Sequence, residues 1–163
     1  MRNILARSLA LGAVVLLGSV AQAQPLEKKT LSLEAARKTV RAVEAKAERN
    51  HWRGMAAVVD EGCWIILLER MDHAAMTASV RLAEGKARSA ALFKKPAQAL
   101  ENAINHGRFA AITARGFIEM QGGLPVVVDG EVIGGISASF VRSEEDKQVA
   151  KAKAGLAALS ERA

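Results

Sequence analysis

Histidine, cysteine and methionine are the side chains of this sequence that could ligate a metal, and they are few. The 163 residues contain three His, one Cys and five Met. The three His are scattered and no second Cys accompanies the first, so the spacing excludes a zinc site of the usual Cys/His type. The candidates are therefore His51, His73, His106, Cys63 and the methionines.

His73 is the first choice among them. It follows Arg70-Met71-Asp72 directly after an expected strand, and loops at the ends of strands often carry ligand-binding side chains. Met71 and Met76 lie close to it in sequence. The alternative is an ordinary surface-loop histidine without a ligand, and the sequence leaves that reading open.

The other candidates have structural readings of their own. His106 precedes Gly107 at an expected helix end, where a histidine also complements the helix dipole. His51 ends an earlier helix and has the same reading. Cys63 falls within an apolar strand, so we expect a buried, unreactive thiol. Arg70 and Asp72 could pair with each other or with a neighbouring loop.

Catalytic motifs give little support for an enzyme. The sequence has no Gly-x-Ser-x-Gly nucleophile elbow and neither of the common phosphate-binding glycine loops. Gly122-Gly123 allows either close approach of a ligand or a bend between strands. The question of catalysis stays open, and a binding protein is favoured.

Helices and strands must position these residues, and the sequence of the first half of the chain predicts these elements clearly. Ser32 can cap a helix that runs to about Asn50. Its apolar stripe recurs at spacings of three and four and consists of Leu33, Ala36, Val40, Val43 and Ala47. Two strands, 55–59 and 63–70, flank a turn at 60–62, with a positive φ expected at Gly62. Both faces of the second strand are apolar, so we expect it to lie at the centre of a sheet.

The second half predicts two helices, three strands and a last helix. An alanine-rich helix covers 77–94, with small buried residues that allow close packing, and another runs from Pro96 to about Asn105. Strands are expected at 116–120, 124–128 and 131–139, the last two joined by Asp129-Gly130. Ser143 opens the final helix, with Asp146 completing a capping box. The order α-β-β-α-α-β-β-β-α indicates an α+β domain with an antiparallel sheet of about five strands.

The N-terminus has the pattern of a secretory signal peptide. Arg2 and Arg7 precede an uncharged apolar run too short to span a membrane, and Ala21-Gln22-Ala23 fits signal peptidase. We expect cleavage after Ala23, a single domain at 24–163, and a periplasmic or secreted location without a stable membrane anchor. The net charge of +6 falls to +4 when Arg2 and Arg7 are removed with the signal peptide. Nucleic-acid binding is not indicated, because the sequence has no basic stripe with aromatic residues beside it.

Several short motifs, in order, resemble the GlcG/HbpS family. The resemblance covers about Leu31 to Leu159 and lies in Val58-Val59-Asp60-x-Gly62, Arg70-Met71-Asp72-x-Ala74, Lys86-Ala87-x-x-Ala90-x-x-Phe93, Gly122-Gly123-x-Pro125, Gly130-x-Val132-Ile133-Gly134, and Asp146 with Ala154-Gly155-Leu156. It implies a profilin-like α+β fold, a homo-oligomer, and haem binding outside the cytoplasm. A related domain forms the C-terminal part of PduO-type cobalamin adenosyltransferases.

Haem would need an axial ligand, an apolar slot and cations for its propionates. The sequence has no Tyr and no Cys-x-x-Cys-His, so tyrosinate ligation and c-type attachment are excluded. The resemblance thus suggests His73 as the iron ligand, with Arg70 or Lys86 facing a propionate and Met71 and His106 as further contacts. Where the family commonly continues its last strand as Ser-Gly-Ala, this chain has Phe140 after Ser139, and we expect that ring to reshape the ligand cleft.

The sequence therefore favours an exported protein that binds haem or a related tetrapyrrole, for transport, storage or sensing. One alternative is an oligomeric accessory module of a catabolic pathway with no tetrapyrrole. Another is an enzyme acting on a small organic acid.

Overall fold

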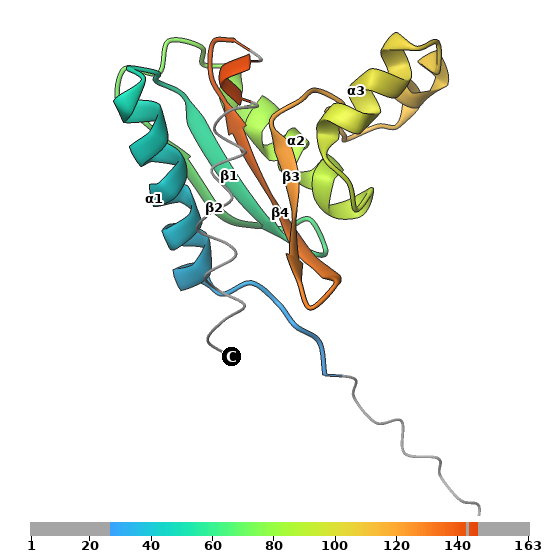
Figure 1. The fold of residues 1–163 in the computed structure, drawn as a ribbon, viewed down its shortest axis with the longest axis horizontal. Helices are drawn as coiled ribbons and strands as arrows, with labels where there is room; N and C mark the ends of the chain where they lie inside the picture. The colour runs from blue at the N-terminus through green and yellow to red at the C-terminus, as the bar shows by residue number, and fades with distance from the viewer. Residues whose placement is uncertain (1–26, 143, 147–163) are drawn as a thin grey trace, which may run out of the picture.

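Figure 1 shows the computed structural model, which describes residues 27–142 and 144–146. The elements are α1 (Leu33–Arg49), β1 (Met55–Asp60), β2 (Ile65–Arg70), α2 (Ser79–Leu92), α3 (Ala97–Asn105), the 3-10 helix η1 (Phe109–Thr113), β3 (Gly123–Val128) and β4 (Glu131–Ser139). The described strands form one antiparallel sheet in the order β2-β1-β4-β3. Helix α1 covers one face and α2 the other, while α3 and η1 extend beyond β3.

Helix α1 forms as its sequence predicts. The Ser32 hydroxyl accepts a hydrogen bond from the backbone N–H of Ala35 at 3.1 Å, which caps the first turn. Four members of the predicted stripe are buried, at positions 36, 40, 43 and 47, and the fifth, Leu33, is exposed. The stripe fixes the rotation of α1, so that its last two turns bring Glu44 and Glu48 beside the end of β2.

Strand β1 lies at the centre of the molecule, and its side chains alternate between two cores. Ala56 and Val58 belong to the core under α1. Met55, Ala57 and Val59 belong to the core under α2. The hairpin to β2 is confirmed, but the positive φ in its turn falls on Cys63, at 69°, and not on Gly62.

The prediction that the second strand is central is wrong. Strand β2 is an edge strand that pairs only with β1 in the described sheet. Trp64, just before it, is 77% exposed and Ile65 is 45% exposed. Ile66, Leu67 and Leu68, in the middle of β2, are partly buried against the two cores, whereas the start of the strand is uncovered.

The strand expected at 116–120 is also absent from the described sheet. The hydroxyl of Ser89, on α2, accepts a hydrogen bond from the N–H of Ile118 at 2.9 Å and donates to its carbonyl oxygen at 3.0 Å. These bonds occupy the backbone groups that a strand would use. The preceding 3-10 helix η1 was not predicted.

Helix α2 packs unusually close to the sheet. A Cβ added at Gly135 on β4 would lie 2.2 Å from the carbonyl oxygen of Ala87, so only glycine permits this approach. The small residues Ala83, Ala87 and Ala90 face the contact, as predicted.

The two predicted terminal features lie largely outside the described residues. The signal peptide at 1–23 is outside them, and of the final helix only residues 144–146 are described, as helical. Within the described part of the chain, no helix is long and apolar enough to cross a membrane.

Candidate functional site

The loop that carries His73 borders a cleft of about 420 Å³, here called the His73 cleft. Its walls come from the last turns of α1, the turn that follows it, the end of β2 and the loop after β2. The lining residues are Glu44, Glu48, Arg53, Glu69, Arg70, Met71, Asp72 and His73. Three of the predicted site residues, Arg70, Met71 and His73, are thus brought together.

Backbone hydrogen bonds hold the His73 loop in place. The N–H of Met71 donates to the carbonyl oxygen of Gly54 at 3.0 Å, and the N–H of Ala74 donates to Met71 at 3.3 Å. His73 has a positive φ of 61°, uncommon for a residue other than glycine. Its ring is exposed and has no hydrogen-bond or ion-pair partner among the described residues. Both ring nitrogens are therefore available to a ligand.

The cleft is strongly charged. Burial raises the pKa of Glu44 above its ordinary value of 4.5, and the nearby charges of Glu69 and Glu48 raise it further, against the opposing effect of Arg41. Arg53 and Arg70 supply positive charge on the same lining. Arg70 forms no ion pair with Asp72 in the described structure, so the pairing considered from the sequence is not observed.

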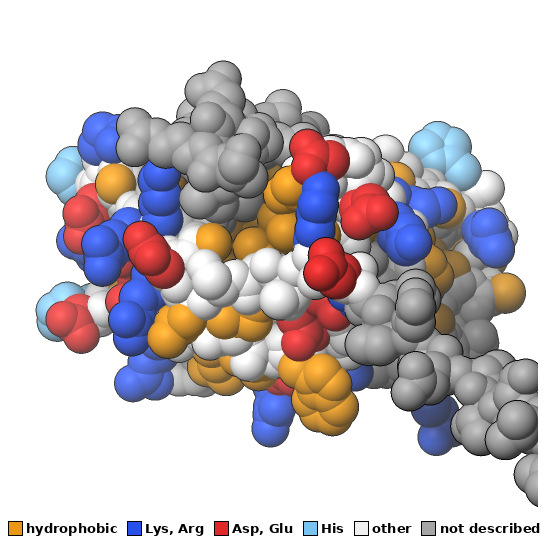
Figure 2. Space-filling model, turned by 90° about the horizontal axis from the view of Figure 1, so that it is seen from below, with side chains coloured by type: hydrophobic (Ala, Val, Ile, Leu, Met, Phe, Trp, Pro, Cys, Tyr) orange, Lys and Arg blue, Asp and Glu red, His pale blue; other side chains and the backbone are white. Residues whose placement is uncertain are grey.

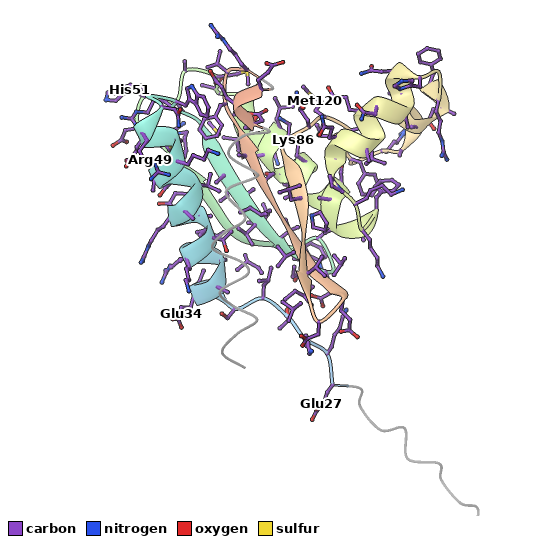
Figure 3. All side chains as sticks on the ribbon, in the orientation of Figure 1. Glu27, Glu34, Arg49, His51, Lys86 and Met120 are labelled. Carbon is purple, nitrogen blue, oxygen red and sulfur yellow. The ribbon has the colours of Figure 1, made fainter. Side chains whose placement is uncertain are left out.

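Lys86 lies elsewhere, in the interior, as Figure 3 shows. Its side chain is 1% exposed, and its ammonium donates a hydrogen bond to the Asp146 carboxylate at 2.5 Å. This position cannot present the ammonium to a propionate in the His73 cleft. Asp146 also accepts a hydrogen bond from the backbone N–H of Phe140. The predicted capping box involves Ser143, which lies outside the described residues.

The other histidines do not line the His73 cleft. His106 caps the end of α3, where its Nδ1 lies 2.6 Å from the carbonyl oxygen of Asn102. This contact fits the helix-end reading of His106. His51 is exposed at the outer end of α1 (Figure 3). Cys63 is buried, and burial raises the pKa of its thiol, as expected of an unreactive cysteine.

Phe140 does not line the His73 cleft, and its expected effect on a ligand cleft stays a prediction. Its ring is buried against Trp52, with the ring centroids 6.4 Å apart, and a Cβ added at Gly54 would lie 2.3 Å from it. The glycine pair at 122–123 is likewise a packing feature. A Cβ at Gly123 would lie 2.2 Å from the carbonyl oxygen of Lys86, so the pair lets β3 approach α2.

The chain matches known proteins over most of its length. The family model described as haem degrading protein HbpS-like matches residues 31–155. The chain belongs to the HbpS-like family.

Individual relatives agree with this family. Protein GlcG of Escherichia coli strain K12 is 38% identical over 112 residues, which cover 69% of this chain and 83% of GlcG. The crystal structure of Klebsiella pneumoniae protein ORFY superposes with a TM-score of 0.76 at 30% identity, covering 84% of this chain and 97% of ORFY. A double mutant of Streptomyces reticuli HbpS gives a TM-score of 0.75 at 28% identity, covering 92% and 98%. The family and the α+β class expected from the sequence are both confirmed.

The residues of this HbpS-like chain meet some of the demands of haem. No group of three or more His, Cys, Asp and Glu side chains that could hold a bare metal ion occurs in the described residues. Haem iron already has its porphyrin nitrogens, so one histidine such as His73 suffices. Arg53 and Arg70 could hold propionates. The lining of the His73 cleft is polar, however, so it suits the propionate edge of a haem better than the whole macrocycle.

Sequence reasoning missed four cleft residues, namely Glu44, Glu48, Arg53 and Glu69. A partial signal was present. Glu44 and Glu48 are spaced by four residues in the last turns of α1, immediately before the turn that leads into β1. The pairing of β1 with β2, which brings Glu69 and Arg70 beside that helix end, has no local signal.

Figure 2 shows one face of the molecule, on which acidic and basic side chains are interspersed and no continuous basic stripe is visible. This distribution agrees with the low net charge expected for residues 24–163. It gives no support to nucleic-acid binding on that face.

Proposed function

We propose that this HbpS-like protein binds haem or a related tetrapyrrole, for transport, storage or sensing, with His73 as the axial ligand. The observation that carries the proposal is the His73 ring itself, which is exposed and unpartnered among the described residues and shares a cleft with two arginines. The haem-related description of the family supports the same ligand. A histidine already engaged in the fold would not be free to bind iron.

A hemin titration followed by absorbance tests this proposal. We expect a saturable, shifted Soret band, and His73→Ala should weaken binding by about tenfold or more, equivalent to about 1.4 kcal/mol. His51→Ala and His106→Ala are matched controls, since both rings are exposed outside the cleft. An equal response from His73→Ala and wild type would remove His73 from the site. No saturation in any variant would rule out haem.

The role of the arginine can be separated from that of the ligand. Arg70→Ala should weaken hemin binding by about tenfold to a hundredfold, because a charge-assisted hydrogen bond contributes about 1.5–3 kcal/mol. With the dimethyl ester of hemin, whose propionates are blocked, the same substitution should have no effect.

A Soret band that fades with time when a reductant and oxygen are added would indicate the degradation named in the family description.

The alternative is an oligomeric accessory module without a tetrapyrrole. The exposed apolar edge of β2, at Trp64 and Ile65, favours it, since such edges commonly bind another chain. The hemin titration separates the two functions, because only the haem-binding function predicts saturable binding. Both functions are compatible with self-association.

Export is part of the proposal. We infer cleavage after Ala23 and a periplasmic or secreted protein, on the pattern of residues 1–23. N-terminal sequencing of the protein recovered from cells expressing the full chain should begin at Gln24; a retained Met1 would contradict export.

A further inference from the structure

A second cleft, of about 380 Å³, lies between the end of α2, helix α3 and η1, and is here called the α3–η1 cleft. Five of its eleven lining residues are alanines, whose short side chains leave the space unfilled. The lining consists of Phe93, Lys95, Ala99, Leu100, Ala103, Arg108, Ala110, Ala111, Thr113, Ala114 and Glu119. It shares no residue with the His73 cleft, so the two can be tested independently.

The walls of the α3–η1 cleft are held from several sides. Phe93 packs edge-on against Phe117, with ring centroids 5.2 Å apart. The Glu101 carboxylate accepts a hydrogen bond from the backbone N–H of Gln121 at 2.8 Å, which ties α3 to the start of β3. The N–H of Arg108 donates to Ala103 and closes the link between α3 and η1. The cleft is therefore preformed, as is usual for small-molecule sites.

Glu119 provides an unusual polar group in this apolar lining. Its Oε1 is buried and has no hydrogen-bond partner in the described structure. Both backbone groups of the preceding Ile118 are bound to Ser89, which fixes the course of the chain beside the cleft. A buried acceptor without a donor costs about 1–3 kcal/mol. A ligand whose N–H or O–H group meets this oxygen, once the Glu119 side chain turns toward the cleft, would recover this free energy.

Two cations complete the chemistry of the cleft. Lys95 and Arg108 are exposed lining residues, and neither forms an ion pair with Glu119 among the described residues. They favour an anionic group at the mouth of the cleft. The volume is at the small end of the usual range for ligand pockets, about 300–1,000 Å³, and suits a single bicyclic ring.

We propose that the α3–η1 cleft binds small aromatic carboxylic acids that carry a ring N–H or O–H donor. The ring lies on the alanine-lined floor, the donor bonds to Glu119, and the carboxylate lies near Lys95 and Arg108. This site goes beyond the proposed haem function and does not depend on it.

Calorimetry with three ligands tests each part of the proposal. Indole-3-acetate has the ring, the donor and the anion; 1-naphthaleneacetate lacks the donor; indole lacks the anion. We expect saturable binding of indole-3-acetate at one site per chain, with each analogue about tenfold weaker. Equal affinity of the two acids, or no saturable binding of indole-3-acetate, would overturn the proposal.

Variants locate the binding. Glu119→Met removes the acceptor at similar volume and should abolish the preference for indole-3-acetate over 1-naphthaleneacetate. Ala103→Leu should fill the floor and weaken both acids, whereas Ala45→Leu, at an exposed position on α1, should change neither. Unchanged binding in Ala103→Leu, or an unchanged preference in a folded Glu119→Met, would overturn the assignment to this cleft.

Discussion

Glu44 carries an energetic cost within the His73 cleft. Its pKa is raised, first by burial and then by Glu69 and Glu48, so the folded protein binds a proton at this carboxylate more readily than the unfolded chain does. The stability that this proton contributes is fully present below the ordinary pKa of 4.5 and is lost as the pH rises through the raised value. At neutral pH the ionised carboxylate therefore destabilises the fold.

Glu44→Gln should accordingly stabilise the protein at pH 7. Relief of the like-charge contact with Glu48, four residues along α1, is expected to contribute roughly 0.2–0.5 kcal/mol. The gain should shrink as the pH falls through the raised pKa of Glu44, and the shrinkage should be complete below the ordinary value of 4.5, where wild-type Glu44 is protonated. Urea unfolding at both pH values measures it. Glu34→Gln, in the first turn of the same helix, should instead destabilise the protein slightly, because it removes a negative charge near the helix N-terminus. An equal gain in stability from Glu34→Gln would contradict the assignment of the effect to the surroundings of Glu44.

At the scale of elements, most local signals were read correctly, apart from the positive φ expected at Gly62, and tertiary placement was not. Ser32 caps α1 and Asp129-Gly130 turns with φ of 49° and 80°, because each conformation depends on the residues themselves. The edge position of β2 depends on which strands pair, and the hydroxyl that binds Ile118 lies 29 residues away on Ser89. Neither follows from periodicity.

The candidate site shows the same contrast between local sequence signals and tertiary placement. The run from Arg70 to His73 was found because it is continuous in sequence, while the glutamates opposite it belong to α1 and were missed. Lys86 had a readable signal: it is three residues after Ala83 and four before Ala90, within the small-residue stripe of α2. A lysine in that position implies burial, and hence a carboxylate partner.

Lys86→Met should destabilise the link between α2 and the residues after β4. It leaves the Asp146 carboxylate buried without its cation, which typically costs about 3–5 kcal/mol. Adding Asp146→Asn should recover part of this loss, because the amide oxygen can still accept from Phe140 while the buried charge is gone. Chemical denaturation of the two variants measures both effects, with Lys38→Met on the exposed face of α1 as control.

The pH dependence provides a further check on this pair. Burial already raises the pKa of Asp146, and the opposing effect of Lys86 disappears in Lys86→Met. The folded variant then takes up a proton at Asp146 as the pH falls. The difference in the free energy of unfolding between wild type and Lys86→Met, here called the stability gap, should therefore narrow. A gap that is constant between neutral and acidic pH would indicate lost packing and not a lost charge.

In the described part of the molecule, an uncovered apolar edge lies at the start of β2. An edge strand with exposed apolar side chains is a template for pairing with another chain. We therefore propose that the homo-oligomer expected from the family forms through this edge.

Trp64→Lys should shift the protein toward monomer, because the new ammonium would have to be desolvated in the contact. Light scattering after size exclusion gives the mass directly. Phe109→Lys, at a residue 66% exposed on η1, is the matched control and should leave the mass unchanged. A wild-type protein that is monomeric at micromolar concentration would refute self-association altogether.

The buried contact between Lys86 and Asp146 joins positions 60 residues apart, and Asp146 follows the last described strand, β4. During synthesis, a chain that has emerged only as far as β4 still has an ammonium in its interior without a counter-charge. The Lys86 side chain therefore has no counter-charge to draw it into the core until Asp146 has also emerged. A nascent chain held open in this way suits passage through a narrow translocation channel, as the proposed export requires.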